Sequence, residues 1–65
     1  MKFNMHYDMI VDYNGHIEAR TGIHVLLADN EVEALSIAKQ FFNNESVLDW
    51  DAILEGNNFV RFLER

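Results

Sequence analysis

The 65-residue chain contains no cysteine. Neither a disulfide framework nor a cysteine-ligated zinc site can therefore stabilise so short a protein. The absence is typical of a reducing compartment, and we expect a cytoplasmic protein. Long apolar runs are missing too, because the longest, Val25 to Ala28, falls far below the ~18 residues of a membrane span. No stretch resembles a signal peptide.

Positive charge is also scarce. Five Lys and Arg stand against eleven Asp and Glu, which gives a net charge of −6. A chain this acidic repels phosphates, so we expect no direct binding to nucleic acid and no binding to anionic membranes. It is suited instead to basic protein surfaces, although acidity also serves solubility alone.

The residues needed for catalysis are poorly represented. Ser36 falls on a predicted helix and Ser46 beside a turn, and neither has the glycine-rich surroundings of an activated nucleophile. The three glycines are isolated, so no phosphate-cradling loop exists. Carboxylates on an open sheet face lack the dry surroundings that acid–base catalysis needs. We therefore expect no enzymatic activity and no cofactor.

The hydrophobic content, 49%, is enough for one small core, and we expect a single domain over residues 1–65. Residues 3 to 13 and 16 to 27 alternate between apolar and polar side chains, which predicts two strands. A helical pattern follows, and residues 45 to 65 are typical of a second hairpin around Glu55 to Asn58. The predicted fold is α+β, in the order β-β-α-β-β, with one helix on a mainly antiparallel sheet.

Asn14-Gly15 usually marks a two-residue hairpin turn. That turn would pair Val11 with Glu18 and place apolar residues beside charged ones. A three-residue loop over residues 13–15 pairs Val11 with Ile17 instead, so that the apolar faces coincide. The pattern therefore favours the three-residue loop. Under it, Thr21 faces the core, and His6, His16 and His24 face outward.

The predicted helix lies within ADNEVEALSIAKQFFNN, residues 28 to 44. Asp29 or Asn30 can cap its start, and Glu31 and Glu33 suit the positive end of the helix dipole. The apolar stripe consists of Ala34, Leu35, Ala38, Phe41 and Phe42, supported by Ile37. Asn43 and Asn44 are plausible end signals.

The second hairpin carries acids on alternate positions. Asp49, Asp51 and Glu55 share one face of the predicted strand, whereas Leu48, Trp50, Ala52 and Leu54 share the other. In the last strand, the pattern leaves open whether Phe59 and Leu63 or Val60 and Phe62 face the helix.

These acids define a candidate partner-binding surface. Asp8, Asp12 and Glu18 of the first hairpin are expected on the same outer side as Asp49, Asp51 and Glu55. Ile10, Leu26 and Ile53 fall among them, as in a contact patch or a homodimer interface. Alternate strand residues lie about 6.6–6.8 Å apart, comparable to successive phosphates. The surface would therefore mimic nucleic acid, or would simply be a solvated sheet face.

Three histidines and Asp8 on one face raise the question of a metal site. The sequence has no closely spaced pair of the H-x-x-x-H kind, and solvated histidines explain the pattern better. No metal is expected.

Residues 28 to 39, ADNEVEALSIAK, resemble a pattern found in small phage-encoded inhibitors built from a strand pair, a helix and a returning strand. The match is carried by Ala28, Glu33, Ala34, Leu35, Ile37 and Ala38. These proteins include a podophage inhibitor of host RNA polymerase and some anti-CRISPR proteins. The pattern is also similar to the first part of antitoxins that neutralise RNA-cleaving toxins. The resemblance implies a tiny inhibitor that occupies another protein's surface, and it carries no site residues with it.

Three functional hypotheses follow. The first is a small acidic inhibitor, encoded by a phage or mobile element, that blocks a CRISPR effector or RNA polymerase through its acidic face. The second is an assembly, scaffold or homodimeric structural protein that uses its sheet face or free edge. The third is an antitoxin that masks a basic toxin. In the first case, rising salt should abolish binding.

Overall fold

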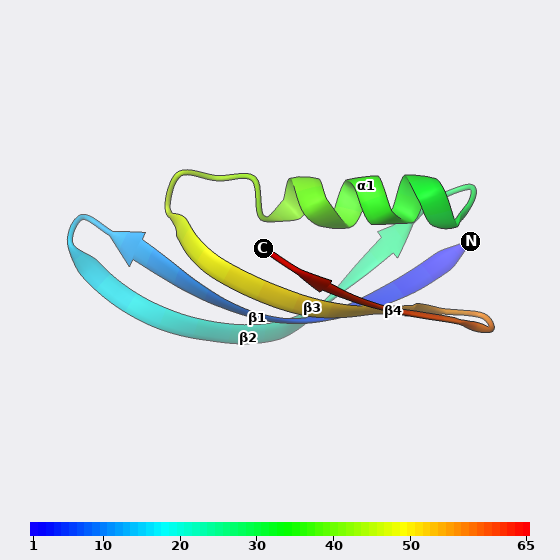
Figure 1. Ribbon diagram of the computed structural model, residues 1–65, viewed down its shortest axis with the longest axis horizontal. Coiled ribbons are helices and arrows are strands. Elements are labelled where there is room, and N and C mark those ends of the chain that lie inside the picture. Colours follow the sequence, from blue (N-terminus) through cyan, green and yellow to red (C-terminus); the bar gives the residue numbers. More distant parts are fainter.

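The computed structural model describes all 65 residues and confirms the predicted element order (Figure 1). The elements are β1 (Lys2–Tyr13), β2 (His16–Leu27), α1 (Glu31–Phe41), β3 (Val47–Gly56) and β4 (Phe59–Glu64). The strands form one antiparallel sheet in the order β2-β1-β3-β4. The inner strands are therefore β1 and β3, and the edges are β2 and β4.

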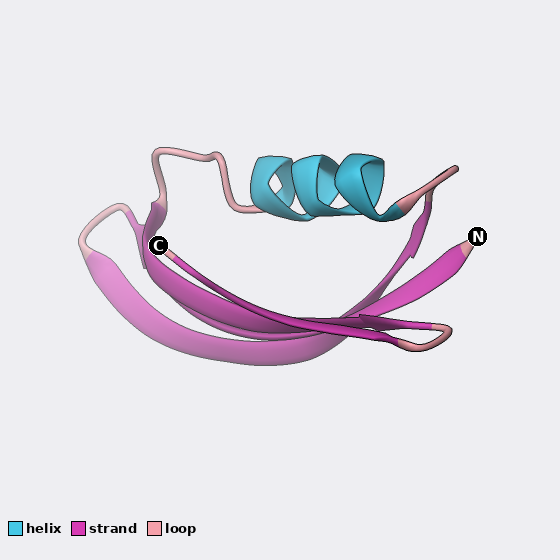
Figure 2. Cartoon of the chain, turned by 45° about the vertical axis from the view of Figure 1, so that its right-hand side comes forward, coloured by secondary structure: helices cyan, strands magenta, loops and turns pink.

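The sheet is strongly curved, and α1 lies against its concave face (Figures 1 and 2). The molecule is elongated, with extents of 39 × 16 × 16 Å. Eleven helical residues span only about 16 Å, whereas the two twelve-residue strands span about 40 Å each. The helix therefore covers part of the concave face, and the convex face, here called the outer face, is bare.

Local signals explain the helix. The Asn30 side chain caps its start by accepting a hydrogen bond of 2.9 Å from the Glu33 N–H. Glu31 and Glu33 occupy the first turn and Lys39 the last, as the helix dipole favours. Ala34 and Ala38 are fully buried against the sheet. This helix is neither long enough nor apolar enough to cross a lipid bilayer.

The core lies between α1 and the concave face. Its aromatic part is built around Phe42, whose ring stacks on Trp50 with centroids 4.2 Å apart and also meets Tyr7 and Phe41. A second contact joins Phe3 and Phe59 edge to face at 6.0 Å. The buried cluster is Phe3, Met5, Leu26, Ala28, Ala34, Ala38, Phe42, Ala52, Leu54, Phe59 and Leu63.

The predicted three-residue loop between β1 and β2 is wrong. Tyr13 pairs with His16 and Val11 with Glu18, so the turn contains only Asn14 and Gly15. Both turn residues have positive φ, 53° and 88°, the conformation of a type I′ turn. The twist of that turn matches the twist of the flanking strands, and this local preference prevails over the match of apolar faces.

The observed register reverses both faces of β2 relative to the prediction, because a shift of one residue exchanges them. Leu26, expected outside, is buried in the core, and Thr21, expected inside, is exposed. His16 and His24 lie on the concave side, where the His24 ring packs on Phe41 at 4.6 Å. The outward residues of β2 are Ile17, Ala19, Thr21, Ile23, Val25 and Leu27.

The second hairpin agrees better with its pattern. It turns at Asn57 and Asn58, and Phe59 and Leu63 are the residues of β4 that face the core. One expectation fails at the start of β3, where a bulge places Leu48 outside the regular pairing with β1 and leaves it 43% exposed. Trp50, Ala52 and Leu54 face the concave side as expected.

Candidate protein-binding surface

Side chains of four strands meet in rows on the outer face, because residues paired across an antiparallel sheet point the same way. One row is apolar except for a histidine: Ile23, His6, Ile53 and Phe62. The neighbouring row runs through Thr21, Asp8, Asp51 and Glu64. No other part of the chain covers these rows, and the bare face is therefore open to a partner.

Three acids are direct neighbours in the second row. Asp8 pairs with Asp51 across β1 and β3, and Asp51 pairs with Glu64 across β3 and β4. We call Asp8, Asp51 and Glu64 the acidic row. Neighbouring strands lie about 4.8 Å apart, so each carboxylate has a like charge beside it. None of the three forms an ion pair within the chain.

Asp49 and Glu55, two further acids of the predicted site, also lie on this face. Asp49 lies two residues before Asp51 and opposite Ile10, and it extends the acidic row along β3. Its carboxylate accepts a hydrogen bond of 3.0 Å from the Trp50 N–H and is otherwise exposed. Glu55 also lies on the outer face, but its carboxylate is bonded to the His6 ring at 2.7 Å. One oxygen of the Glu55 carboxylate is therefore already hydrogen-bonded within the chain.

Asp12 has a structural contact. Its carboxylate accepts a hydrogen bond of 2.8 Å from the Gly15 N–H and so stabilises the hairpin turn. Its own N–H donates to Ser46, which ties the tip of the hairpin to the segment after α1. Asp12 thus lies on the predicted face, but its carboxylate is already hydrogen-bonded to the turn of its own hairpin.

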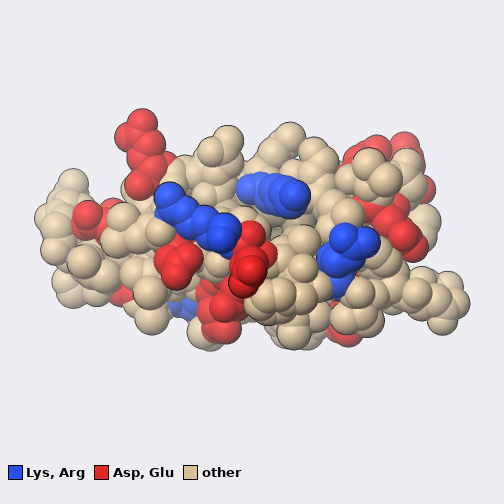
Figure 3. Space-filling view, in the orientation of Figure 1, with Lys and Arg blue, Asp and Glu red and all other residues tan.

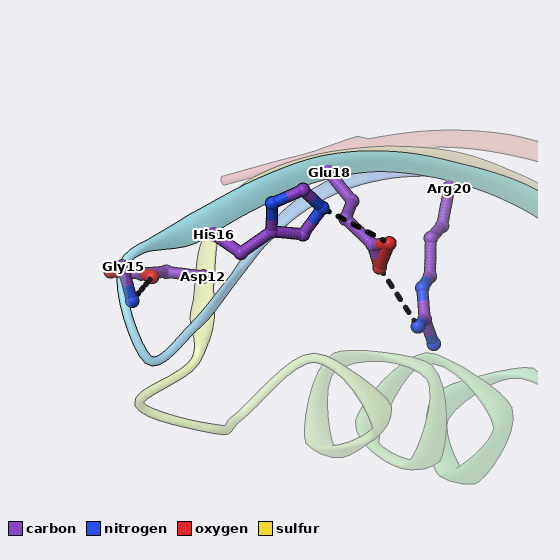
Figure 4. Close-up of polar contacts among 5 residues, drawn as sticks. All are labelled: Asp12, Gly15, His16, Glu18 and Arg20. Carbon is purple, nitrogen blue, oxygen red and sulfur yellow. Dashed lines mark hydrogen bonds and ion pairs between the residues drawn. The ribbon is translucent and has the colours of Figure 1, made fainter.

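Glu18 does not belong to the outer face. Because the register of β2 differs by one residue from the prediction, Glu18 points to the concave side, the side on which α1 lies (Figure 4). There it accepts a hydrogen bond of 3.0 Å from Arg20 and lies 3.8 Å from His16. This bond raises the pKa of Arg20 above its ordinary value. The Arg20 guanidinium also lies over the Tyr13 ring, 4.9 Å from its centroid.

Apolar side chains border the acidic row on both sides. Ile53 and Phe62 lie on one side and Ile10 on the other, and all three are exposed. Beside Ile10, the small side chains of Ala19 and Thr21 leave a shallow hollow of about 270 Å³. The hollow is also lined by Asp8, Asp49 and Asp51. Acids and apolar groups are therefore interleaved over one continuous area.

Sequence reasoning missed Glu64, Phe62 and Ile23 as members of this surface. The first two lie on β4, where the pattern allowed either orientation, and the third lies on β2, whose register was predicted wrongly. Two of the five cations are engaged elsewhere in the chain, because Arg20 is bonded to Glu18 and Arg65 to the carbonyl oxygens of Val47 and Leu48. Figure 3 shows Lys and Arg gathered near the middle of one side, over α1 and β4, with acids beside and below them.

The histidines are dispersed by the fold. His6 lies on the outer face, whereas His16 and His24 lie on the concave side. The chain contains no group of three or more His, Cys, Asp or Glu side chains arranged to hold a metal ion.

Comparison with protein-family models, with curated proteins and with solved structures finds no match to this chain.

Proposed function

We propose that the protein is a non-catalytic inhibitor that binds a basic surface of a nucleic-acid-handling protein through its outer face. The observation that supports this most directly is the acidic row, in which Asp8, Asp51 and Glu64 are neighbours without a cation between them. Each close pair of like charges costs the fold some tenths of a kcal/mol. A basic partner would remove that cost and gain the attraction.

The composition of the surface also suits a protein partner. Exposed apolar residues lie beside the acids, and burying their surface against a partner is favourable because it removes that surface from water. Ile53 and Phe62 fill this role next to Asp51. An interface of this kind combines electrostatic attraction, which accelerates association, with apolar contacts, which slow dissociation.

The spacing of the acids suits a groove that binds nucleic acid. Asp49 and Asp51 are two residues apart on β3, a distance of about 6.6–6.8 Å, which is comparable to successive phosphates. A protein groove that binds a phosphate backbone with Lys and Arg would therefore meet carboxylates at similar intervals. A CRISPR effector or an RNA polymerase would be blocked by occupation of such a groove.

The test is a pull-down with the tagged protein from bacterial lysate, at low and high salt. The wild type is compared with Asp51→Lys, and Glu45→Lys is the control because it makes the same charge change in an exposed loop. We expect the wild type and the control to retain a DNA- or RNA-handling protein that high salt, or added DNA or RNA, releases. The Asp51 variant should retain much less.

Equal retention by the Asp51 variant would contradict the proposal. So would a partner that resists high salt, because an apolar or strand-pairing interface has no such dependence. Capture of a small basic toxin would instead indicate that the protein is an antitoxin that uses the same acidic face.

A further inference from the structure

The free edge of β2 is the longest unprotected strand edge in the molecule. In the two-residue hairpin, the pair that flanks the turn exchanges its backbone hydrogen bonds, so His16 and every second residue after it bond to β1. The alternate residues therefore direct their N–H and C=O groups away from the sheet. These residues are Ile17, Ala19, Thr21, Ile23, Val25 and Leu27.

Several of the usual protecting devices are absent from this edge. Proteins blunt exposed edges with proline, lysine, bulges or short strands. The twelve residues of β2 include no proline and no lysine, and the pairing with β1 runs without a bulge. The other edge is different, because β4 has only six residues and the Arg65 side chain covers carbonyl groups of β3 beyond its end.

We propose that β2 pairs antiparallel with β2 of a second copy of this chain, centred on Thr21. This register joins two four-stranded sheets into one of eight strands. It places Ile17 opposite Val25 and Ala19 opposite Ile23 of the other copy, and it forms about ten backbone hydrogen bonds. The apolar and β-branched side chains of the edge then contact one another on the outer face.

The same register suits the charges on the concave side. Glu18 of one copy comes opposite His24 of the other, and Arg20 comes opposite Gly22, which leaves room for its long side chain. A second copy supplies all these contacts twice because the arrangement is symmetric. This self-complementarity favours a second copy over an unrelated strand as the occupant of the edge.

Electrostatics favours edge pairing over stacking of two outer faces. Stacking would bring one acidic row against another. In the edge dimer, three strand spacings separate Asp8 of one copy from Asp8 of the other, or about 14 Å, which exceeds the Debye length of ~8 Å at physiological salt. β2 itself carries only one acid, Glu18, which Arg20 balances. Repulsion across the interface is therefore small.

The proposal is tested on the purified full chain, without any partner, so that it stands or falls independently of the inhibitor function. Sedimentation velocity should give twice the 7.6 kDa mass of one chain at concentrations above the dissociation constant. A single-chain mass at every concentration up to about 1 mM would overturn it.

Thr21→Lys is the decisive variant. It places two like charges directly opposite each other at the dimer centre, while within one chain the new lysine faces Asp8 and keeps the fold. We expect the dissociation constant to rise about fivefold. Val60→Lys is the matched control, because Val60 is 71% exposed and lies on the other edge strand. Loss of dimer in the control but not in the Thr21 variant would overturn the proposal.

Single cysteines report the register, because the chain has no cysteine of its own. Thr21→Cys should form a disulfide-linked dimer under mild oxidation, since directly paired residues lie about 5.5 Å apart at their Cα atoms. Ile23→Cys should not, because it faces Ala19 of the other copy. Linkage through residue 23 instead of residue 21 would overturn the Thr21-centred register.

Discussion

Asp8 and Asp51 face each other across β1 and β3, and no cation lies between them. Glu64 adds a third carboxylate beside Asp51. The fold thus keeps a local repulsion at the centre of its largest uncovered face. A change that relieves this repulsion should stabilise the chain and weaken its proposed interaction, and the two effects are measured separately.

Asp51→Lys should stabilise the protein. It converts two like-charge neighbours into two opposite-charge pairs, with Asp8 and Glu64. The free energy of unfolding, measured by urea denaturation at low salt, should rise by roughly 1 kcal/mol. The gain should shrink in 1 M salt, where the Debye length is about 3 Å. Glu45→Lys should show no comparable salt-sensitive gain, and a destabilised Asp51 variant would contradict the expectation.

Asp12→Ala separates a structural acid from the proposed binding acids. The substitution removes the 2.8 Å hydrogen bond to the Gly15 N–H and should lower the free energy of unfolding by about 1 kcal/mol. Partner retention in the pull-down should stay near the wild-type level under conditions where the variant is folded. Asp12→Asn, whose side-chain oxygen can still accept the bond, should recover most of the stability. A large loss of partner by the asparagine variant would place Asp12 in the interface.

The two glycines that face aromatic rings should respond differently to alanine. A Cβ at Gly56 would lie 2.5 Å from the Phe3 ring, which is fully buried and packs on Phe59. A Cβ at Gly22 would meet the hydroxyl end of Tyr7 at 2.7 Å, and that side chain is only half-buried. Gly56→Ala should therefore cost about 1–3 kcal/mol, and Gly22→Ala less. Thermal unfolding followed by circular dichroism checks the order, and the reverse order would show that Tyr7 is the more rigid side chain.

Two phenylalanines distinguish the core from the surface. Phe42 is 4% exposed and stacks on Trp50, so Phe42→Ala should cost about 3–5 kcal/mol and change the tryptophan fluorescence. Phe62 is 58% exposed on the outer face, so Phe62→Ala should change stability by less than about 1 kcal/mol. The Phe62 variant should still weaken partner binding. If binding is unchanged, the apolar row contributes nothing to the interface.

Part of the candidate surface was predictable because it depends on local alternation. Asp49, Asp51 and Glu55 share a face for the simple reason that strand side chains alternate, and the same holds for Asp8 and Asp12. The sequence did not predict which of these carboxylates form hydrogen bonds within the chain. The bonds from Glu55 to His6 and from Asp12 to Gly15 depend on neighbours that only the pairing of strands supplies.

The sequence by itself determined the order of elements, the capped helix and the internal alternation of each strand, because these follow from neighbours a few residues apart. Only the tertiary structure decided which face of β2 is covered. A helix of eleven residues buries Leu26 and packs against His24 but leaves the rest of β2 uncovered. The match of apolar faces therefore did not determine the register of β2. The Asn14-Gly15 turn then set the register, and one residue of difference moved Glu18 away from the other acids and brought Ile23 to the outer face.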